Sequence, residues 1–111
     1  MLKISGRVVR GDGYGRKLGF PTVNLDTNLE LTEVKPLQGV YAGEAILENK
    51  SYRAGIVIGP NKKVEAHLIG YSGDAYGKEV TLELGKFLRE YKKFDKEEDL
   101  ILQIEKDLKE C

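Results

Sequence analysis

The chain has little of what several common protein classes need. Its 111 residues include one cysteine, three prolines and no tryptophan. A single cysteine cannot form an internal disulfide, so a reducing compartment is the default expectation. No apolar run approaches the roughly 20 residues that span a bilayer, and the first residues lack the apolar core of a signal peptide. We therefore expect a cytoplasmic protein with no membrane partner, and Cys111 as an exposed terminal thiol without a role.

An excess of charge of one sign is also absent. The 18 Lys and Arg residues balance 18 Asp and Glu residues, so the formal net charge is +0. A balanced chain has no general electrostatic attraction for nucleic acid or acidic lipid, and neither is expected as a partner. The length suits one modest core. We expect a single domain over residues 1–111 and a monomer.

Short alternating segments predict a β protein. Polar or glycine-containing turns separate them, at residues 48–50, 59–63 and 71–74. Gly85 is expected to mark a bulge before Phe87. Short strands at this spacing favour an antiparallel sheet that closes into a small barrel. The expected strands cover residues 2–10, 40–47, 51–58, 64–69 and 79–84.

The C-terminal segment changes its period from strand to helix. One apolar stripe at helical spacing consists of Leu100, Ile101, Ile104 and Leu108. Lys, Glu and Asp occupy the other faces, which predicts an amphipathic helix that packs against the barrel. Asp95 followed by Glu98 has the spacing of a capping box, so Asp95 is the expected N-cap.

Residues 11–24 are the most informative segment of the chain. They read Gly-Asp-Gly-Tyr-Gly-Arg-Lys-Leu-Gly-Phe-Pro-Thr-Val-Asn. The glycines permit close backbone approach to a ligand, and Arg16 and Lys17 add positive charge. Thr22 and Asn24 lie two apart after Pro21, so on an extended chain they share one side and offer neutral oxygens that suit Mg²⁺. The segment therefore predicts a polyphosphate site, although a hairpin turn capped by Thr22 and Asn24 is the simpler alternative.

Glu65 is the candidate proton acceptor. It lies among apolar residues on the expected strand 64–69 and shares a face with His67. A carboxylate placed in a site could take the proton of an attacking hydroxyl. Without further information, a glutamate on a strand is more often exposed to solvent. For His67 we favour a structural hydrogen bond.

An ordered set of motifs resembles the ATP-dependent riboflavin kinases, as found in the C-terminal half of bifunctional bacterial FAD synthetases. The resemblance runs from about Ile4 to Leu108. Single motifs are weak evidence, but their order along the chain is specific. The motifs are Gly6-Arg-Val-Val-Arg-Gly11, Gly15-Arg-Lys-Leu-Gly-Phe-Pro-Thr-Val-Asn24, Gly39-Val-Tyr41, Val64-Glu-Ala-His-Leu68, Tyr76-Gly77, and Phe87-Leu-Arg89 with Lys92 and Phe94-Asp95.

The resemblance implies a fold and a reaction. The fold is a small closed antiparallel Greek-key β-barrel of about six strands with a C-terminal α-helix. The reaction transfers the γ-phosphate of Mg-ATP to the 5′-hydroxyl of riboflavin, giving FMN and ADP. Many bacterial relatives carry an adenylyltransferase domain that makes FAD. We expect no such domain in this sequence, which would stop at FMN whether it is a free-standing enzyme or a domain of a longer chain.

The resemblance also implies roles for individual residues. Glu65 would be the catalytic base, and Thr22 and Asn24 would be the Mg²⁺ ligands. The flavin-side residues would be Arg89, Lys92 and Phe94. The ATP-side residues would be Gly11, Gly15, Arg16, Lys17, Thr22, Asn24, Leu68, Gly70 and Tyr76.

Two alternatives from other classes stay open. A non-catalytic flavin- or nucleotide-binding barrel would keep the loops but lose the base or the metal residues. A structural barrel without a ligand would leave the composition of residues 11–24 unexplained. The presence of Glu65, Thr22 and Asn24 favours the enzyme.

Overall fold

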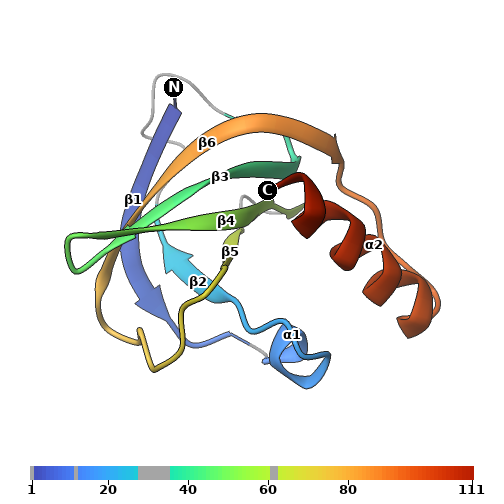
Figure 1. Ribbon diagram of the computed structural model, residues 1–111, viewed down its shortest axis with the longest axis horizontal. Helices are drawn as coiled ribbons and strands as arrows, with labels where there is room; N and C mark the ends of the chain where they lie inside the picture. The colour runs from blue at the N-terminus through green and yellow to red at the C-terminus, as the bar shows by residue number, and fades with distance from the viewer. Residues whose placement is uncertain (1, 12, 28–35, 61–62) are drawn as a thin grey trace.

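In the part of the chain that the structure describes, six strands form a closed barrel, and the longer of two helices lies outside it (Figure 1). The computed structural model describes residues 2–11, 13–27, 36–60 and 63–111. The two helices are α1 (Tyr14–Lys17) and α2 (Glu97–Glu110). The strands are β1 (Leu2–Val9), β2 (Val23–Asp26), β3 (Gly39–Leu47), β4 (Lys50–Ile58), β5 (Val64–Leu68) and β6 (Glu79–Glu90).

The strand order around the barrel is β1-β2-β5-β4-β3-β6, with antiparallel pairing throughout. Strands β3, β4 and β5 follow one another as neighbours, whereas β2 lies beside β5 rather than beside β3. Three consecutive strands with a fourth returning to the far side form a Greek key. The predicted fold class is confirmed.

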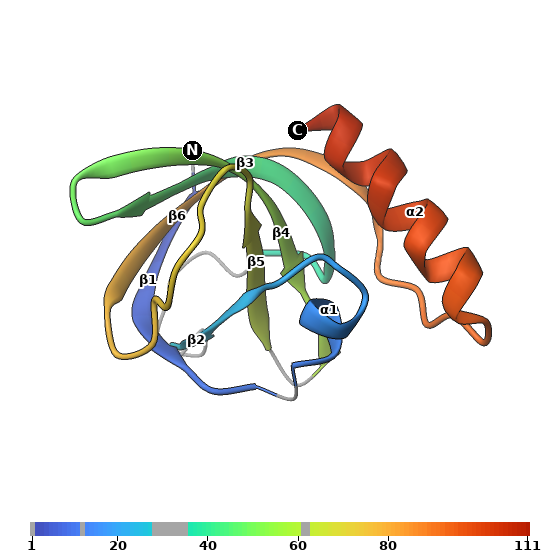
Figure 2. The same ribbon diagram turned by 60° about the horizontal axis from the view of Figure 1, so that its bottom comes forward.

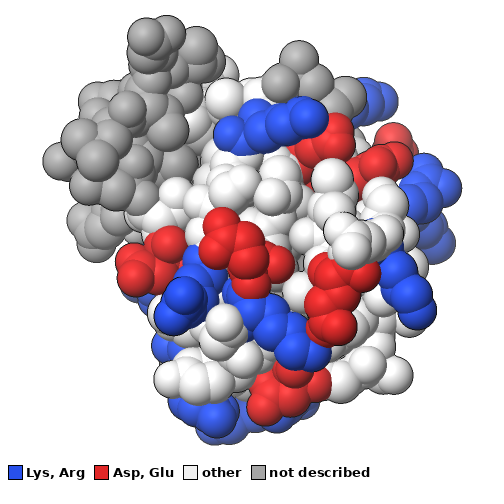
Figure 3. All heavy atoms as spheres, turned by 90° about the vertical axis from the view of Figure 1, so that its left-hand side faces the viewer, with Lys and Arg blue, Asp and Glu red and all other residues white. Residues whose placement is uncertain are grey.

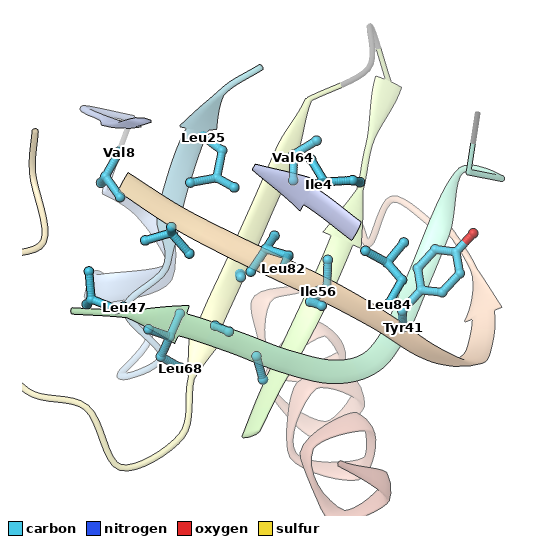
Figure 4. Packing of buried hydrophobic residues seen from close by; sticks show 14 of the residues in the cluster. Ile4, Val8, Leu25, Tyr41, Leu47, Ile56, Val64, Leu68, Leu82 and Leu84 are labelled. Atoms are coloured by element: carbon cyan, nitrogen blue, oxygen red, sulfur yellow. The ribbon is translucent and has the colours of Figure 1, made fainter. Parts of the chain in front are cut away.

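Alternating side chains fill the barrel. Along β5, Val64, Ala66 and Leu68 are buried, while the residues between them are half-buried and point outward. Figure 4 shows Leu82 and Ile56 near the middle of the core, with Val8 and Leu25 toward one side and Tyr41 and Leu84 toward the other. The largest side chains with almost no exposed surface are Leu47, Ile56, Leu82, Val64 and Val80.

All five segments predicted as strands are strands, but β6 is six residues longer than its predicted segment, which ended at Leu84. Tyr41 pairs with Phe87 and Gly43 pairs with Leu84, so β6 holds one extra residue between these pairs. This irregularity is the bulge expected at Gly85. Pattern analysis missed β2 and α1, which are only four residues long. The predicted turn at residues 59–63 includes two residues, 61 and 62, that lie outside the described part of the chain.

The helix predicted at the C-terminus is present, but its predicted cap is wrong. Helix α2 begins after Lys96, whose extended backbone (φ −112°, ψ 132°) makes it the N-cap, and no side chain caps this end. Asp95 lies one residue too early for that role. The first turn carries the acidic residues Glu97, Glu98 and Asp99. Their negative charges interact favourably with the positive end of the helix dipole.

The last turn of α2 packs on the outer face of β4. A Cβ atom added to Gly55 would lie 3.2 Å from Leu108 Cδ2 and 3.7 Å from Cys111 Sγ. Cys111 is only 8% exposed, and its thiol donates to the Asp107 carbonyl oxygen at 3.4 Å. The expectation of an exposed terminal thiol is therefore wrong. Figures 1 and 2 show the C-terminal end of α2 at the barrel and its first turn farther away.

The surface opposite α2 carries both signs of charge. Figure 3 shows Lys and Arg side chains interspersed with Asp and Glu on this face. Within the described ranges, no helix is both long and apolar enough to cross a membrane.

Candidate active site

A pocket of about 390 Å³ opens beside the end of β1. The α1 turn, the start of β2 and the loop after β5 complete its wall. The charged residues among its described lining are two arginines, Arg10 and Arg16, and one carboxylate, Asp74. The described lining residues are 8–11, 13, 16, 21–24, 68 and 71–76.

The glycine-rich loop forms a single helical turn in the pocket wall. The Lys17 amide bonds to the Gly13 carbonyl at 3.2 Å, and the Gly19 amide bonds to the Arg16 carbonyl at 3.1 Å. Gly19 then adopts φ +91°, a left-handed conformation that ends the turn and suits glycine. Arg16 lines the pocket. Gly15 lies inside α1, and Lys17, at its last position, is not among the described lining residues.

Gly11 lies directly against the side chain of Asn24. A Cβ atom at residue 11 would come within 2.3 Å of Asn24 Nδ2 and 2.8 Å of Oδ1. The glycine therefore leaves the space that the Asn24 amide occupies. Thr22, two residues before Asn24, lines the same pocket. The structure thus brings Thr22 and Asn24 together with Arg10 and Arg16 in one pocket. The sequence had predicted all of these site residues except Arg10.

Glu65 lies on the outer face of the barrel, next to the pocket. Its neighbours along β5 point into the core, and it is paired with Asn24 of β2 on one side and Val57 of β4 on the other. Leu25 is a core residue, so the alternation of β2 directs Asn24 outward as well. Glu65 and Asn24 therefore share one surface.

His67 is hydrogen-bonded to the segment that precedes β2. Its Nδ1 donates to the Pro21 carbonyl oxygen at 2.7 Å, and its ring meets Phe20 edge-on at 6.1 Å between centroids. The structural hydrogen bond expected for His67 is present. It holds the residue that precedes Thr22.

The loop after β5 forms the other side of the pocket. Asp74 Oδ1 accepts a hydrogen bond from the Tyr76 amide at 2.9 Å, and the Arg10 guanidinium carbon lies 4.3 Å from the centre of the Tyr76 ring. Leu68 and Tyr76 line the pocket. Gly70 turns the chain just after β5 with φ +85° and is not among the described lining residues.

Sequence reasoning missed two charged residues of this pocket, Arg10 and Asp74. Arg10 directly precedes Gly11, so a cation beside the glycine-rich loop was a usable signal. Asp74 gave no such signal, because an aspartate in a turn is common for local reasons.

The predicted flavin-side residues lie where β6 leads into α2. Lys92 and Phe94 line a second pocket of about 300 Å³, together with Asp99, Leu102, Gln103 and Lys106 of α2. Arg89 is paired with Asp107 of α2, at 2.9 Å between Nη2 and Oδ2. Contact of these residues with a flavin stays a prediction.

The neutral oxygens that line the first pocket include the Thr22 hydroxyl and the Asn24 amide carbonyl, both of which suit a hard cation. The close approach of Gly11 confines the Asn24 amide there. In the part of the chain that is described, no group of three or more His, Cys, Asp or Glu side chains could hold a metal. The donors present suit a cation that is held largely by phosphate oxygens and water.

Sequence comparison with known proteins indicates one family. A family model described as riboflavin kinase (flavokinase) matches residues 1–111. A bifunctional riboflavin kinase/FMN adenylyltransferase from Escherichia coli (strain K12) is 35% identical over 112 residues, covering 94% of this chain and 35% of that protein. The chain thus spans about a third of the length of the bifunctional relatives that it matches.

Two solved structures share the fold closely. A riboflavin kinase from Trypanosoma brucei superposes with a TM-score of 0.74 at 25% identity, covering 96% of this chain and 72% of that one. A Streptococcus pneumoniae structure described as a macrolide-efflux protein gives a TM-score of 0.88 at 29% identity, covering 97% of this chain and 37% of that one. On the match of the family model to residues 1–111, this chain belongs to the riboflavin kinase family.

Proposed function

We propose that this chain transfers the γ-phosphate of Mg-ATP to the 5′-hydroxyl of riboflavin and releases FMN and ADP. The observation that carries the proposal is the pairing of Asn24, in the wall of the first pocket, with Glu65 on the neighbouring strand. Directly opposite residues of an antiparallel pair have Cβ atoms about 4.5–5.5 Å apart. A proton acceptor would thus stand beside the place where the phosphates are held.

The first pocket would bind ATP. Arg16, with Arg10, would neutralise phosphate charge, and the backbone around Gly11 and Gly15 would approach the phosphate oxygens. Lys17 would reach the phosphates from the end of α1. Leu68, Gly70 and Tyr76 would surround the adenine.

Thr22 and Asn24 would hold Mg²⁺ through their neutral oxygens. When it is bound with ATP, the cation would neutralise charge on the transferred phosphoryl group. Because neither ligand carries charge, the protein alone should bind the cation weakly.

Glu65 would accept the proton of the terminal ribityl hydroxyl. As that oxygen forms its bond to the γ-phosphorus, the bond from phosphorus to the bridging oxygen breaks and ADP leaves. Phosphoryl transfer needs positioning, charge stabilisation and a proton acceptor, and the chain offers residues for each.

The flavin would bind on the α2 side of Glu65. In the strand order, β5 lies between β2, which carries Asn24, and β4, on which α2 packs at Gly55. Phe94 would stack or pack on the ring, Lys92 would serve its polar groups, and Arg89 would lie beside Phe94. The base would then lie between the two substrates.

The decisive experiment is incubation of the chain with riboflavin, ATP and Mg²⁺, followed by chromatography for FMN. We expect FMN to form only when a divalent cation is present, with a chelator as the control. Binding of ADP and riboflavin without turnover would instead identify a non-catalytic binding barrel. Absence of both FMN and ligand binding at saturating concentrations would refute the proposal.

A further inference from the structure

Arg89 forms an ion pair with Asp107 of helix α2. Its Nε lies 3.1 Å from each carboxylate oxygen of Asp107, and its Nη2 lies 2.9 Å from Oδ2. Gln103 Nε2 donates a further hydrogen bond to Asp107 Oδ1 at 2.9 Å. The Arg89 and Asp107 side chains are 22% and 11% exposed. A forked arginine–carboxylate pair of this kind has one preferred geometry and is shielded from water.

The pair is in contact with both walls of the second pocket. One wall is Phe94 with Lys92, and the Arg89 guanidinium carbon lies 5.7 Å from the centre of the Phe94 ring. The other wall belongs to α2 and includes Gln103, which is bonded to Asp107. Neither Arg89 nor Asp107 is among the described residues that line this pocket.

We propose that Arg89 and Asp107 are positioning residues for the flavin. Their ion pair holds α2 and the segment 91–96 together, so that Phe94 and Gln103 line one pocket. This inference rests on the function proposed above and refines the part of Arg89 in it. A largely buried carboxylate without its cation is strongly unfavourable, so the pair keeps α2 against the end of β6.

A second ion pair between the same two elements provides a matched control. Lys86 of β6 and Glu110 of α2 approach to 3.9 Å, with side chains 72% and 57% exposed. Exposed pairs of this kind contribute little. Removing either partner should leave flavin binding unchanged.

The test compares the full chain with Arg89→Ala, Asp107→Ala and the double variant. Riboflavin affinity is measured by fluorescence quenching, ADP-Mg²⁺ affinity by calorimetry, and KM for each substrate by FMN formation. We expect each single variant to weaken riboflavin binding by a similar factor, about tenfold, and the double variant to be no weaker. ADP affinity should change less than about twofold. Arg89→Lys and Asp107→Asn, which conserve size or charge, should give smaller losses of riboflavin affinity and keep the test possible if an alanine variant misfolds.

The variant Asp107→Ala separates the two possible roles of Arg89. If Arg89 bound flavin directly, this variant would release the guanidinium, and riboflavin affinity would stay equal or rise while Arg89→Ala lost it. That result would overturn the inference, as would unchanged riboflavin affinity in both variants or an equal loss of both ligands. Failure of the unsubstituted chain to bind riboflavin would instead overturn the proposed function.

Discussion

Glu65 and Asn24 belong to different strands and meet only because β2 pairs with β5. If Glu65 is the base, Glu65→Gln keeps the shape but cannot accept the proton. We predict a fall in kcat of about 10²–10⁴-fold, with much smaller changes in the affinities for ADP and riboflavin. Glu83→Gln, on the outer face of β6, is the matched control and should stay within about twofold. Turnover of Glu65→Gln within a few-fold of the parent would assign the base elsewhere.

A substitution at Gly11 tests the position of the Asn24 side chain. An alanine Cβ would collide with the Asn24 amide, which must then rotate away from its position in the pocket. We predict that Gly11→Ala raises KM for Mg-ATP as much as Asn24→Ala does, about tenfold, and leaves KM for riboflavin nearly unchanged. Gly19→Ala is the control, because it strains the backbone at φ +91° but has nothing within 4 Å to displace. A normal KM for Mg-ATP in Gly11→Ala would show that the Asn24 amide is not used.

Helix α2 is attached to the barrel through its last turns, and Cys111 reports on that attachment. Burial raises the pKa of the Cys111 thiol, and the neighbouring Asp107 carboxylate adds to the rise. The thiolate is the reactive form, so alkylation should be slow at pH 7 and should accelerate only at a higher pH than for a free cysteine. We predict a rate at least about tenfold below that of the denatured chain.

The same measurement on Asp107→Ala tests whether the ion pair holds the helix. We expect faster alkylation of Cys111 in this variant, because the last turn of α2 loses its bond to β6 and the thiol loses a negative neighbour. The control is Glu110→Ala, which removes an exposed partner next to Cys111. A Cys111 that reacts like a free thiol in the parent chain would contradict the packing of α2 on Gly55.

On the scale of the whole molecule, each pocket is bordered by a segment that lies outside the described core. None of the described core residues lies in segments 13–19 or 91–96, so the backbone amides of these segments should exchange with solvent quickly in the free protein. We predict that ADP-Mg²⁺ and riboflavin together protect both segments more than either ligand alone, and that each ligand tightens the other. Hydrogen exchange with each ligand and with both measures this, and the core strand β4 is the internal control. Equal protection in the free and doubly bound states would mean that both segments are preformed.

Local patterns sufficed for much of the fold. The alternation of Val64, Ala66 and Leu68 with outward residues requires only neighbours along the chain, and so does the helical stripe ending at Leu108. The family motifs at residues 11–24 and 64–68 pointed to the candidate site for the same reason. Local patterns failed where the element was short, as for β2 and α1, because four residues are too few to show a period.

Only the tertiary structure decided which of these residues meet. Asn24 faces Glu65 because the barrel closes with β2 beside β5, and Arg89 reaches Asp107 because α2 folds back on β4. Cys111 is buried for that same reason, although a terminal cysteine carries no sign of burial in its neighbours. The sequence by itself determines which segments form strands or helices, because their periodic patterns depend on residues only a few positions apart. Pairings across the barrel depend instead on how all six strands share one core, so local pattern alone could not supply them.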